Sequence, residues 1–389
     1  MRYFAGLDIS DTTTNICIIN ELGAIVHEMI AETKPESIAA KLQSVNIPIE
    51  KVGMETGAKS NWLWRTLNLS YPTTCYDAFK ISKLISLKIN KTDKNDARII
   101  AEVTRLNCLS DVLSLEVYVK NETSQEIVTL IRAREDLVQQ NTHVYNVIRA
   151  ICKTHGCVIP PTSPESFTKV VYEAMKSLPK LVALSIRAFI VLYDPLRSSI
   201  HTLTQHIEIL AKKSLNAQIL TTVPEVGAIT ALYYASLIDD PKRFGDAKSA
   251  GAYFGLTPQQ QSSGEKQYQG SISKRGDPLM RKLLVGIARR VLQRNAPSNE
   301  LKQWGQKKEK ARGKGKAAIA LARHTSVIML AMLLTQIPYK EKPTPPPKKR
   351  GIVLATAELS SLAKLSQEQG ELDLRSIKHI KTLLKKATV

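Results

Sequence analysis

The first thirty residues constrain the fold most, because three strand-like segments follow one another with only short polar turns between them. The segments YFAGLDIS, NICIIN and AIVHEMI alternate with the turns DTTT and ELG, a pattern typical of an antiparallel meander. Downstream, helical patterns near 36–44, 59–68 and 78–87 alternate with the strand-like stretches KVGMET and PTTCYD. This alternation predicts a mixed α/β sheet covered by helices.

From about residue 120 the pattern becomes helical. Leu130, Leu137, Val144 and Ile151 recur every seven residues, and Ile131 starts a second series of the same period. The spacing predicts one long helix, either a coiled-coil arm or a helix packed within one chain, which periodicity does not separate.

More helix is expected beyond this arm, so the C-terminal part is predicted to be all-α. The stretch TTVPEVGAITALYYASLI resembles a helix-hairpin-helix element, whose turn offers backbone N–H groups to a phosphate. An ordinary helical hairpin is the alternative. The changes of pattern predict an α/β domain at 1–115, a helical arm at 116–160, a helical domain at 161–335, and a Pro/Lys-rich linker and tail at 336–389.

The charge of the chain points to an anionic partner. The formal net charge is +20, and a charge of that size repels itself unless a partner of opposite sign compensates it. Nucleic acid fits best, whereas we expect no membrane association, because no long uncharged apolar run is evident. The N-terminus has the pattern of a strand and not of a signal peptide. Five scattered cysteines fit a reducing cytoplasm.

Four carboxylates stand out by their positions. Asp8 lies inside the first predicted strand, where a charge is unfavourable without a partner. Glu55 ends the strand GMET, and Asp93 and Asp96 lie three residues apart at the start of a predicted helix, on one face. The alternative to a functional role is that aspartate is simply common in a first helical turn, with Lys91, Lys94 and Arg98 neutralising the pair.

Taken together, the four acids predict a divalent-metal site. Mg²⁺ prefers carboxylate oxygens, and two such ions can bracket a scissile phosphate. A basic surface would bind DNA while the acids hold the metal. Carboxylates on two strands and a helix are the arrangement of a ribonuclease-H-like, RuvC-like domain.

Several motifs in order resemble those of a known family. GLDIS, GMETG and KTDKNDA resemble the DEDD motif set of the bacterial transposases of insertion-sequence family one-ten, whose relatives include the pilin-gene invertase. PEVGAITALYYASLI, the segment from FGDAKSAG to RKLLV, and RGKGKAAIALARH resemble the second conserved domain of that family. The resemblance covers roughly residues 3–335.

The resemblance implies roles for individual residues. Asp8, Glu55, Asp93 and Asp96 match the catalytic, metal-binding set, with Mg²⁺ as the cofactor. A serine nucleophile is implied in the Ser–Gly motif of the segment QQSSGEK, which makes Ser263 the candidate and Ser262 the neighbouring alternative. Glu265 stands where many relatives have a second glycine.

The resemblance also implies partners. These are the element ends and target DNA, a non-coding bridge RNA that pairs with both, and further copies of the chain in a dimeric or tetrameric synapse with active sites completed between subunits. The expected function is therefore that of an insertion-sequence transposase, a site-specific recombinase in the bacterial cytoplasm that associates with the nucleoid.

Basic residues gather in two segments after the serine motif. One begins at Lys274 and includes the next predicted helix, and the other is the run 300–316. Asp277 and Pro278 are predicted to be the N-cap and first position of that helix. Phosphate contact is the functional interpretation, and a solvated helix face is the alternative. The predicted nucleic-acid-binding residues are Lys274, Arg275, Arg281, Lys282, Arg289, Arg290, Lys307, Lys308, Arg312 and Lys314.

Two other functions fit parts of the pattern. A metal-dependent junction-resolving nuclease would use the acids with water as the nucleophile and would not need Ser263. A non-catalytic nucleic-acid-binding protein would use the basic residues alone, and its binding would weaken with salt yet survive loss of the acids.

Overall fold

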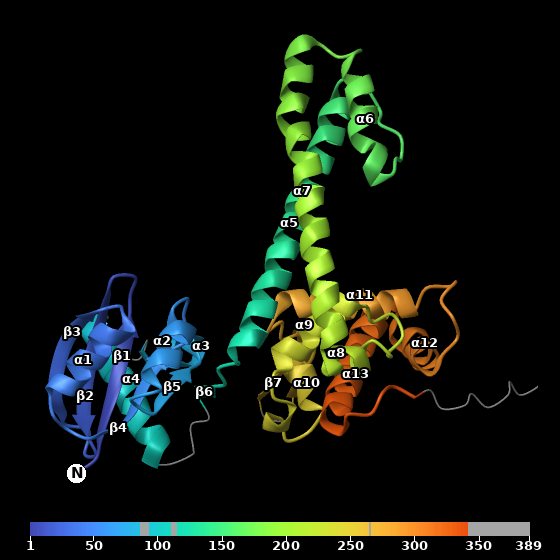
Figure 1. Ribbon diagram of the computed structural model, residues 1–389. Coiled ribbons are helices and arrows are strands. Elements are labelled where there is room, and N and C mark those ends of the chain that lie inside the picture. The colour runs from blue at the N-terminus through green and yellow to red at the C-terminus, as the bar shows by residue number, and fades with distance from the viewer. Residues whose placement is uncertain (86–92, 110–114, 264–265, 341–389) are drawn as a thin grey trace, which may run out of the picture. The chain divides into compact units, whose positions relative to one another are not determined.

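The computed structural model describes residues 1–85, 93–109, 115–263 and 266–340 of the 389 (Figure 1). The chain forms two compact units, Met1–Leu130 (unit 1) and Ile131–Val389 (unit 2). Unit 1 contains a mixed sheet and unit 2 is mostly helical, which confirms the predicted fold class of an α/β part followed by an all-α part.

Unit 1 is built on a six-stranded sheet with the order β3-β2-β1-β4-β5-β6. β1 pairs antiparallel with β2 and parallel with β4, so the predicted meander and mixed sheet are both present. The strands are β1 Tyr3–Ile9, β2 Thr13–Asn20, β3 Ile25–Glu32, β4 Ile49–Glu55, β5 Thr73–Tyr76 and β6 Glu116–Val117. The helices are α1 Pro35–Ser44, α2 Ser60–Leu67, α3 Ala78–Ile85 and α4 Asp93–Leu109.

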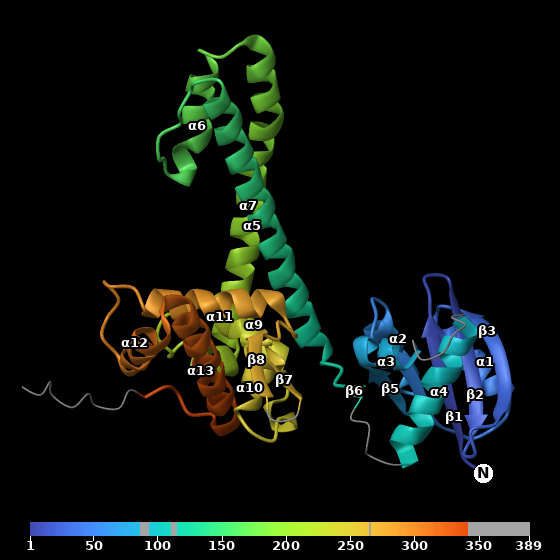
Figure 2. The same ribbon diagram turned by 180° about the vertical axis from the view of Figure 1, so that it is seen from behind.

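Helices cover both faces of this sheet. One face packs on α1 and α2 through alternate residues such as Leu7 of β1 and Met54 of β4, both fully buried. The other face packs on α4, where Phe4 and Cys17 join Ala97 and Ala101 in one cluster. The view from behind shows α4 lying across the strands (Figure 2).

Two glycines let α4 lie directly on the backbone of the sheet. A Cβ atom on Gly6 would lie 2.2 Å from the amide nitrogen of Ala101 and 2.3 Å from the carbonyl oxygen of Ala97. A Cβ on Gly53, the β4 residue opposite Gly6, would lie 1.9 Å from Oγ1 of Thr104. Glycine at both positions therefore sets the distance between helix and sheet.

Unit 2 is assembled from helices and one hairpin. α5 Glu122–Thr154 enters it from unit 1, as the seven-residue spacing predicted. The other elements are α6 Pro164–Met175, α7 Lys180–Lys213, α8 Leu215–Leu220, α9 Ala228–Ile238, the 3-10 turn η1 Pro241–Arg243, α10 Ser249–Tyr253, the hairpin strands β7 Pro258–Ser263 and β8 Lys266–Ile272, α11 Pro278–Val291, α12 Glu300–Arg312 and α13 Lys314–Thr335. Helices α8 and α9 lie on either side of the predicted turn and pack together, which fits both interpretations of this stretch.

The long helix α5 packs within its own chain along its C-terminal half. Val144, Ile148 and Cys152 of α5 share a core with Phe167 of α6 and Ile190 of α7, and α5 and α7 run side by side (Figures 1 and 2). Arg134 of α5 also donates to the Oγ1 of Thr204 on α7, at 2.8 Å. Of the two interpretations of the heptad spacing, packing within one chain accounts for this half.

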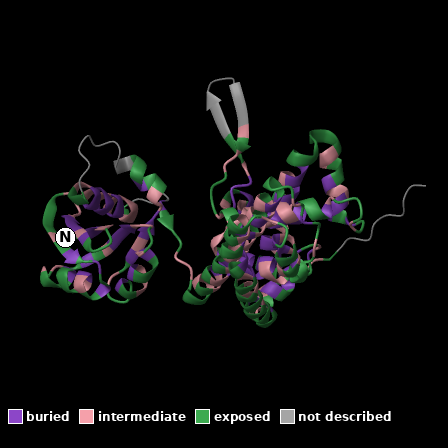
Figure 3. Ribbon diagram, turned by 90° about the horizontal axis from the view of Figure 1, so that it is seen from above, coloured by how far each residue is buried: buried purple, intermediate pink, exposed green. Residues whose placement is uncertain are grey.

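The core of unit 2 surrounds α13. Within the described ranges, α13 is the one helix long and apolar enough to span a bilayer, and more than half of its most apolar window is buried inside the protein. Its buried residues pack against α10, α11 and α12, as expected of a core helix. Buried residues likewise fill the interior of each unit in Figure 3.

Candidate metal centre and nucleic-acid interface

Asp8 and Glu55 lie next to each other at the carboxyl ends of two parallel strands. Gly6 pairs with Gly53 and Leu7 with Met54, so the next residues along β1 and β4 are Asp8 and Glu55. Both are partly exposed and line one cleft of about 390 Å³. The ends of adjacent parallel strands are where α/β folds usually place their ligands.

The same cleft contains a basic residue that sequence reasoning missed. Lys59, just before α2, lines the cleft together with Ser10, Asp11 and Ser60. Its Nζ donates to the carbonyl oxygen of Asp11 and lies 3.6 Å from the Asp11 carboxylate. In the sequence, the position of Lys59 four residues after Glu55 could have pointed to it. A cation at the rim of an acidic cleft is suited to a phosphate that approaches the acids.

Asp93 and Asp96 occupy the first turn of α4, as predicted. Asp93 is exposed, whereas Asp96 is only 8% exposed and next to Ala97, which packs on the sheet. Asp8 and Glu55 have the same strand parity as Gly6 and Gly53, which face α4. All four acids therefore belong to the α4 side of the sheet.

Arg98, one of the cations near the helical pair, has a partner on the sheet. Arg98 binds Glu28 of β3 through two of its nitrogens, one of them Nη2 at 2.9 Å from Oε2. This hydrogen-bonded pairing lowers the pKa of Glu28. Arg98 thus ties α4 to the edge of the sheet. Lys91 lies outside the described residues, and Lys94 is exposed.

The structure brings two of the four acids together. Asp8 and Glu55 share a cleft, while Asp93 and Asp96 do not line it. Over the described ranges, no three His, Cys, Asp or Glu side chains gather closely enough to hold one ion. The adjacent pair nevertheless fits Mg²⁺, which is commonly held by one or two carboxylates and keeps several waters.

Ser263 is the last residue of β7 and pairs with Lys266 of β8, while Ser262 pairs with Gln267. The polar composition of this segment suggests a loop, but residues 258–263 and 266–272 form a two-stranded hairpin. Its base is held by backbone contacts, since Ser273 donates its amide to the carbonyl of Thr257 and Lys274 to that of Gly255.

Two glycines make this base possible. Gly255 has a φ of +68° and Gly276 a φ of +81°, values that favour glycine. A Cβ on Gly255 would lie 2.0 Å from the carbonyl oxygen of Arg275, and a Cβ on Gly276 would lie 2.0 Å from that of Tyr253. The two chain segments at the base therefore touch backbone to backbone.

A basic cleft of about 560 Å³ runs along α11, beside the end of the hairpin. Its wall contains Ile272, the last residue of β8, and its charged residues are five of the ten predicted for nucleic-acid binding: Lys274, Arg281, Lys282, Arg289 and Arg290. No carboxylate belongs to the described lining of this cleft.

Three of these cations also have partners within the protein. Arg281 donates to the carbonyls of Phe254 and Arg275 at 3.0 Å each, which ties α11 to the hairpin base. Lys282 pairs with Glu135 of α5, and Arg290 with the carboxylate and carbonyl of Glu225 in the α8–α9 turn. Their positions are therefore fixed by structure as well as being available to an anion.

The other five predicted basic residues do not line this cleft. Arg275 lies in the exposed turn before α11, and Lys307, Lys308, Arg312 and Lys314 lie on and after α12, mostly exposed. The 300–316 run is thus largely helical. Lys308 lies over the ring of Trp304, which stacks on His324 with ring centroids 4.4 Å apart. Burial lowers the pKa of His324, so its ring is neutral at neutral pH.

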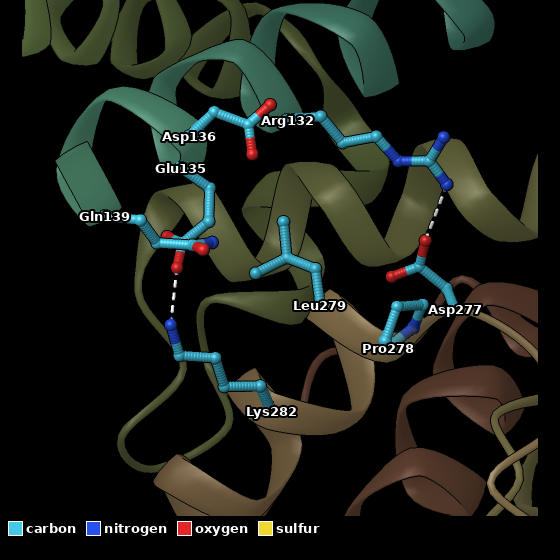
Figure 4. A pocket seen from close by; sticks show the side chains of 8 residues that line it. All are labelled: Arg132, Glu135, Asp136, Gln139, Asp277, Pro278, Leu279 and Lys282. Atoms are coloured by element: carbon cyan, nitrogen blue, oxygen red, sulfur yellow. Dashed lines mark hydrogen bonds and ion pairs between the residues drawn. The ribbon is translucent and has the colours of Figure 1, made fainter.

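A polar network absent from the sequence analysis holds the start of α11 (Figure 4). Asp277 is the N-cap, as predicted, and accepts from the amide of Met280 at 2.7 Å. Its other carboxylate oxygen accepts from Arg132 of α5 at 2.7 Å and from the hydroxyl of Tyr233 of α9 at 2.9 Å. Burial raises the pKa of Tyr233 well above its usual value, so the hydroxyl stays a donor.

Two family models match the chain. Residues 5–155 match the IS110-type DEDD model, described as "Transposase", and residues 217–303 match the model described as "Transposase IS116/IS110/IS902 family". The first contains Asp8, Glu55, Asp93 and Asp96. The second contains the β7–β8 hairpin, α11 and every residue of the cleft lining except Ile319.

Curated relatives agree with these matches. The "Transposase for insertion sequence element IS1111A" of Coxiella burnetii is 26% identical over 340 residues, which cover 86% of this chain and 90% of the relative. The "Transposase for insertion sequence element IS1328" of Yersinia enterocolitica is 31% identical over 56% of this chain and 64% of the relative. The "Probable family 20 transposase" of Pseudomonas aeruginosa is 27% identical over 65% and 75%.

Proposed function

Because this chain belongs to the IS110 family of insertion-sequence transposases, we propose that it cleaves and rejoins DNA through Ser263, assisted by a divalent metal bound at Asp8 and Glu55. The chain is a transposase, an enzyme of phosphoryl transfer on DNA. The identity of the nucleophile and of the metal ligands is the part that we add.

One observation carries the metal assignment. Asp8 and Glu55 are successive partners at the ends of β1 and β4, and they line the same cleft. Asp93 and Asp96 start the helix that covers this side of the sheet and are proposed to complete the ligand set. Bound Mg²⁺ would stabilise negative charge on the phosphate oxygens.

The serine chemistry balances without an external energy source. The Oγ of Ser263 forms a bond to the scissile phosphorus, the bond from phosphorus to one sugar oxygen breaks, and that oxygen receives a proton. The phosphoserine ester retains the energy of the cleaved bond. Attack on this ester by a hydroxyl of another strand end restores the DNA backbone and frees the serine.

The basic residues are proposed to hold the DNA during this exchange. The cations of the α11 cleft lie at the base of the hairpin whose far end carries Ser263. They are suited to DNA phosphates that flank the reacting phosphate. Lys307, Lys308, Arg312 and Lys314 offer a second basic surface on and after α12. Element ends and target DNA are the proposed substrates.

The family resemblance further supports three proposals about the assembled enzyme. A bridge RNA made by the element would select donor and target DNA by base pairing. A dimer or tetramer of the chain would form the synapse. The protein would act in the bacterial cytoplasm, in contact with the nucleoid.

A covalent-trapping assay tests the nucleophile. Purified chain, labelled element-junction and target DNA, the flanking RNA and Mg²⁺ are incubated and separated on a denaturing gel. The wild-type chain, Ser263→Ala, Ser262→Ala and Asp8→Asn are compared. We expect an adduct with the wild type and with Ser262→Ala, and no adduct with Ser263→Ala or Asp8→Asn.

Two other outcomes decide for the alternatives. Cleaved DNA without adduct, unaffected by Ser263→Ala, would identify a metal-dependent nuclease that uses water. DNA binding with no cleavage by any variant, lost as salt rises, would identify a non-catalytic binding protein.

A further inference from the structure

We propose that the α11 cleft binds an unpaired DNA segment, with a base placed against the helix backbone at Gly286. This inference rests on the proposed function, in which the cleft binds DNA. It specifies the state of that DNA, a strand whose bases are exposed and not stacked in a duplex.

Gly286 is a glycine that the fold does not require. Gly286 lies in the middle of α11, Pro278–Val291, where glycine weakens a helix relative to alanine. Packing within the chain does not require it, because a Cβ at this position would meet only Nη1 of Arg290, at 3.7 Å. A Cβ on Gly6, Gly255 or Gly276, by contrast, would lie less than 2.4 Å from a backbone atom. A glycine without an internal contact that lines a cleft leaves room for something outside the chain.

The cleft combines positive charge with apolar surface. Beside the five cations, the lining contains apolar side chains that are half-buried: Ile272, Leu283, Val285 and Ile319. The cations suit phosphates, but apolar side chains gain nothing from a phosphate. Their natural partner is the flat face of a base, and a duplex keeps those faces stacked inside.

The cleft also has a size and position that suit an unpaired strand. The cleft of about 560 Å³ is within the range of roughly 300–1,000 Å³ typical of small-ligand sites. It therefore has room for a nucleotide or two of single strand. It also lies at the end of β8, where the Ser263 hairpin joins α11. Ser263 lies at the other end of this hairpin, so an unpaired strand held here would extend along the hairpin toward the phosphate proposed to react.

Binding measurements with a chemical control test the proposal. Fluorescence anisotropy of the full chain carrying Ser263→Ala, without metal, is measured at one salt concentration. The probes are a single-stranded DNA, the same sequence as a duplex, the same sequence as RNA, and a single strand with abasic sites. The variants are Gly286→Leu, which fills the cleft, and the control pair Lys307→Ala with Lys308→Ala.

We expect Gly286→Leu to weaken single-stranded DNA binding about tenfold and duplex binding less than twofold. Without Gly286→Leu, the abasic strand should bind weakly. Its affinity should equal that of the intact strand for Gly286→Leu, because the contact between base and cleft is missing in both cases. The lysine pair should weaken every probe alike. Thermal unfolding should show Gly286→Leu to be at least as stable, since leucine favours a helix over glycine.

Three results would overturn the proposal. Equal weakening of single strand and duplex by Gly286→Leu would mean that the cleft holds only phosphates. If Gly286→Leu weakens the binding of no probe, nothing occupies the cleft at Gly286. If only the RNA probe binds, the ligand of the cleft is RNA and not DNA. Because these assays involve neither cleavage nor metal, failure of the Ser263 mechanism would leave their outcome unchanged.

Discussion

Gly6 shows how a single residue links the fold of unit 1 to its acidic site. The helix that carries Asp93 and Asp96 rests on the backbone of β1 at this glycine. Any side chain here would lift α4 from the sheet and move both acids. The position therefore matters for stability and for the proposed metal site at once.

Gly6→Ala is expected to destabilise the protein by about 1–3 kcal/mol, the usual range for forcing a methyl group into a packed site. Gly57→Ala is the matched control, because a Cβ at Gly57 has nothing within 4 Å. Urea unfolding followed by circular dichroism measures both. Equal midpoints for the two variants would contradict the contact inferred at Gly6.

Mg²⁺ is expected to stabilise the folded chain. A ligand at a hundred times its dissociation constant adds about 2.7 kcal/mol, which raises the melting temperature. Asp8→Asn should abolish this shift, and EDTA should reverse it in the wild type. Asp11→Asn is the control in the same cleft, since the Asp11 side chain is 99% exposed. A shift of equal size in all three chains would argue against Asp8 as a ligand.

At the scale of elements, α4 also shields a thiol. Burial, with a further contribution from the charge of Glu28, raises the pKa of Cys17 on β2 to about 11. Only about a thousandth of such a thiol is thiolate at about pH 8, whereas an ordinary cysteine is appreciably ionised there. As the pH rises toward 11, the reactive fraction of Cys17 grows.

Alkylation by iodoacetamide should therefore modify Cys157, which is partly exposed, far faster than Cys17 near pH 8. Urea should equalise the two rates, and Gly6→Ala should accelerate modification of Cys17 by loosening α4. Mass spectrometry of the digested chain gives both rates. Rapid labelling of Cys17 in the native wild type would show that α4 does not cover it.

The β7–β8 hairpin depends on its base in the same way that α4 depends on Gly6. Gly276→Ala places a methyl group against the carbonyl of Tyr253 and forces an unfavourable φ. We expect loss of most of the covalent adduct while the helices of unit 2 stay folded. Gly245→Ala, which meets nothing within 4 Å, is the control. Adduct yield unchanged by Gly276→Ala would show that the base does not position the serine.

Elements with strong periodicity were the predictable ones. β1, β2 and β3 were predicted from strand-like segments between short polar turns, and α5 from its heptad spacing. The β7–β8 strands were missed because PQQQSS and KQYQGSI hardly alternate apolar with polar residues. Their strand form is imposed from outside, by the backbone contacts at the hairpin base.

The candidate site was predictable in its residues but not in its geometry. Asp8 and Glu55 stood out as acids in strands, yet their adjacency depends on the register of β1 with β4, a long-range pairing. The bond between Arg132 and Asp277 joins residues 145 positions apart, and no local pattern reports it. The sequence likewise offered no reason to single out Gly286, because only the structure shows that packing does not require a glycine at this position of α11.

At the scale of the whole molecule, the net charge is +20, and the number of lysines and arginines that contact phosphates determines how DNA binding responds to salt. Each phosphate contact contributes about 0.9 to the slope of log affinity against log salt. Replacing Lys307 and Lys308 with alanine should lower the slope by about 2 in total and weaken all sequences alike. Lys176→Ala, which removes a lysine paired with Glu173 on α6, should leave the slope unchanged. Titrations of duplex DNA at several salt concentrations measure it.

The hairpin base has a consequence for how far Ser263 can reach. Because the base is closed by main-chain contacts at Gly255 and Gly276, strand length beyond it is free to vary without disturbing the helices. Each strand residue adds about 3.3 Å, and additions in pairs keep every side chain on its original face. Lengthening both strands by two residues would carry the serine roughly 7 Å further from α11. The length of the hairpin thus sets the distance between α11 and Ser263. Selection or an engineer can adjust this length separately from the rest of the protein.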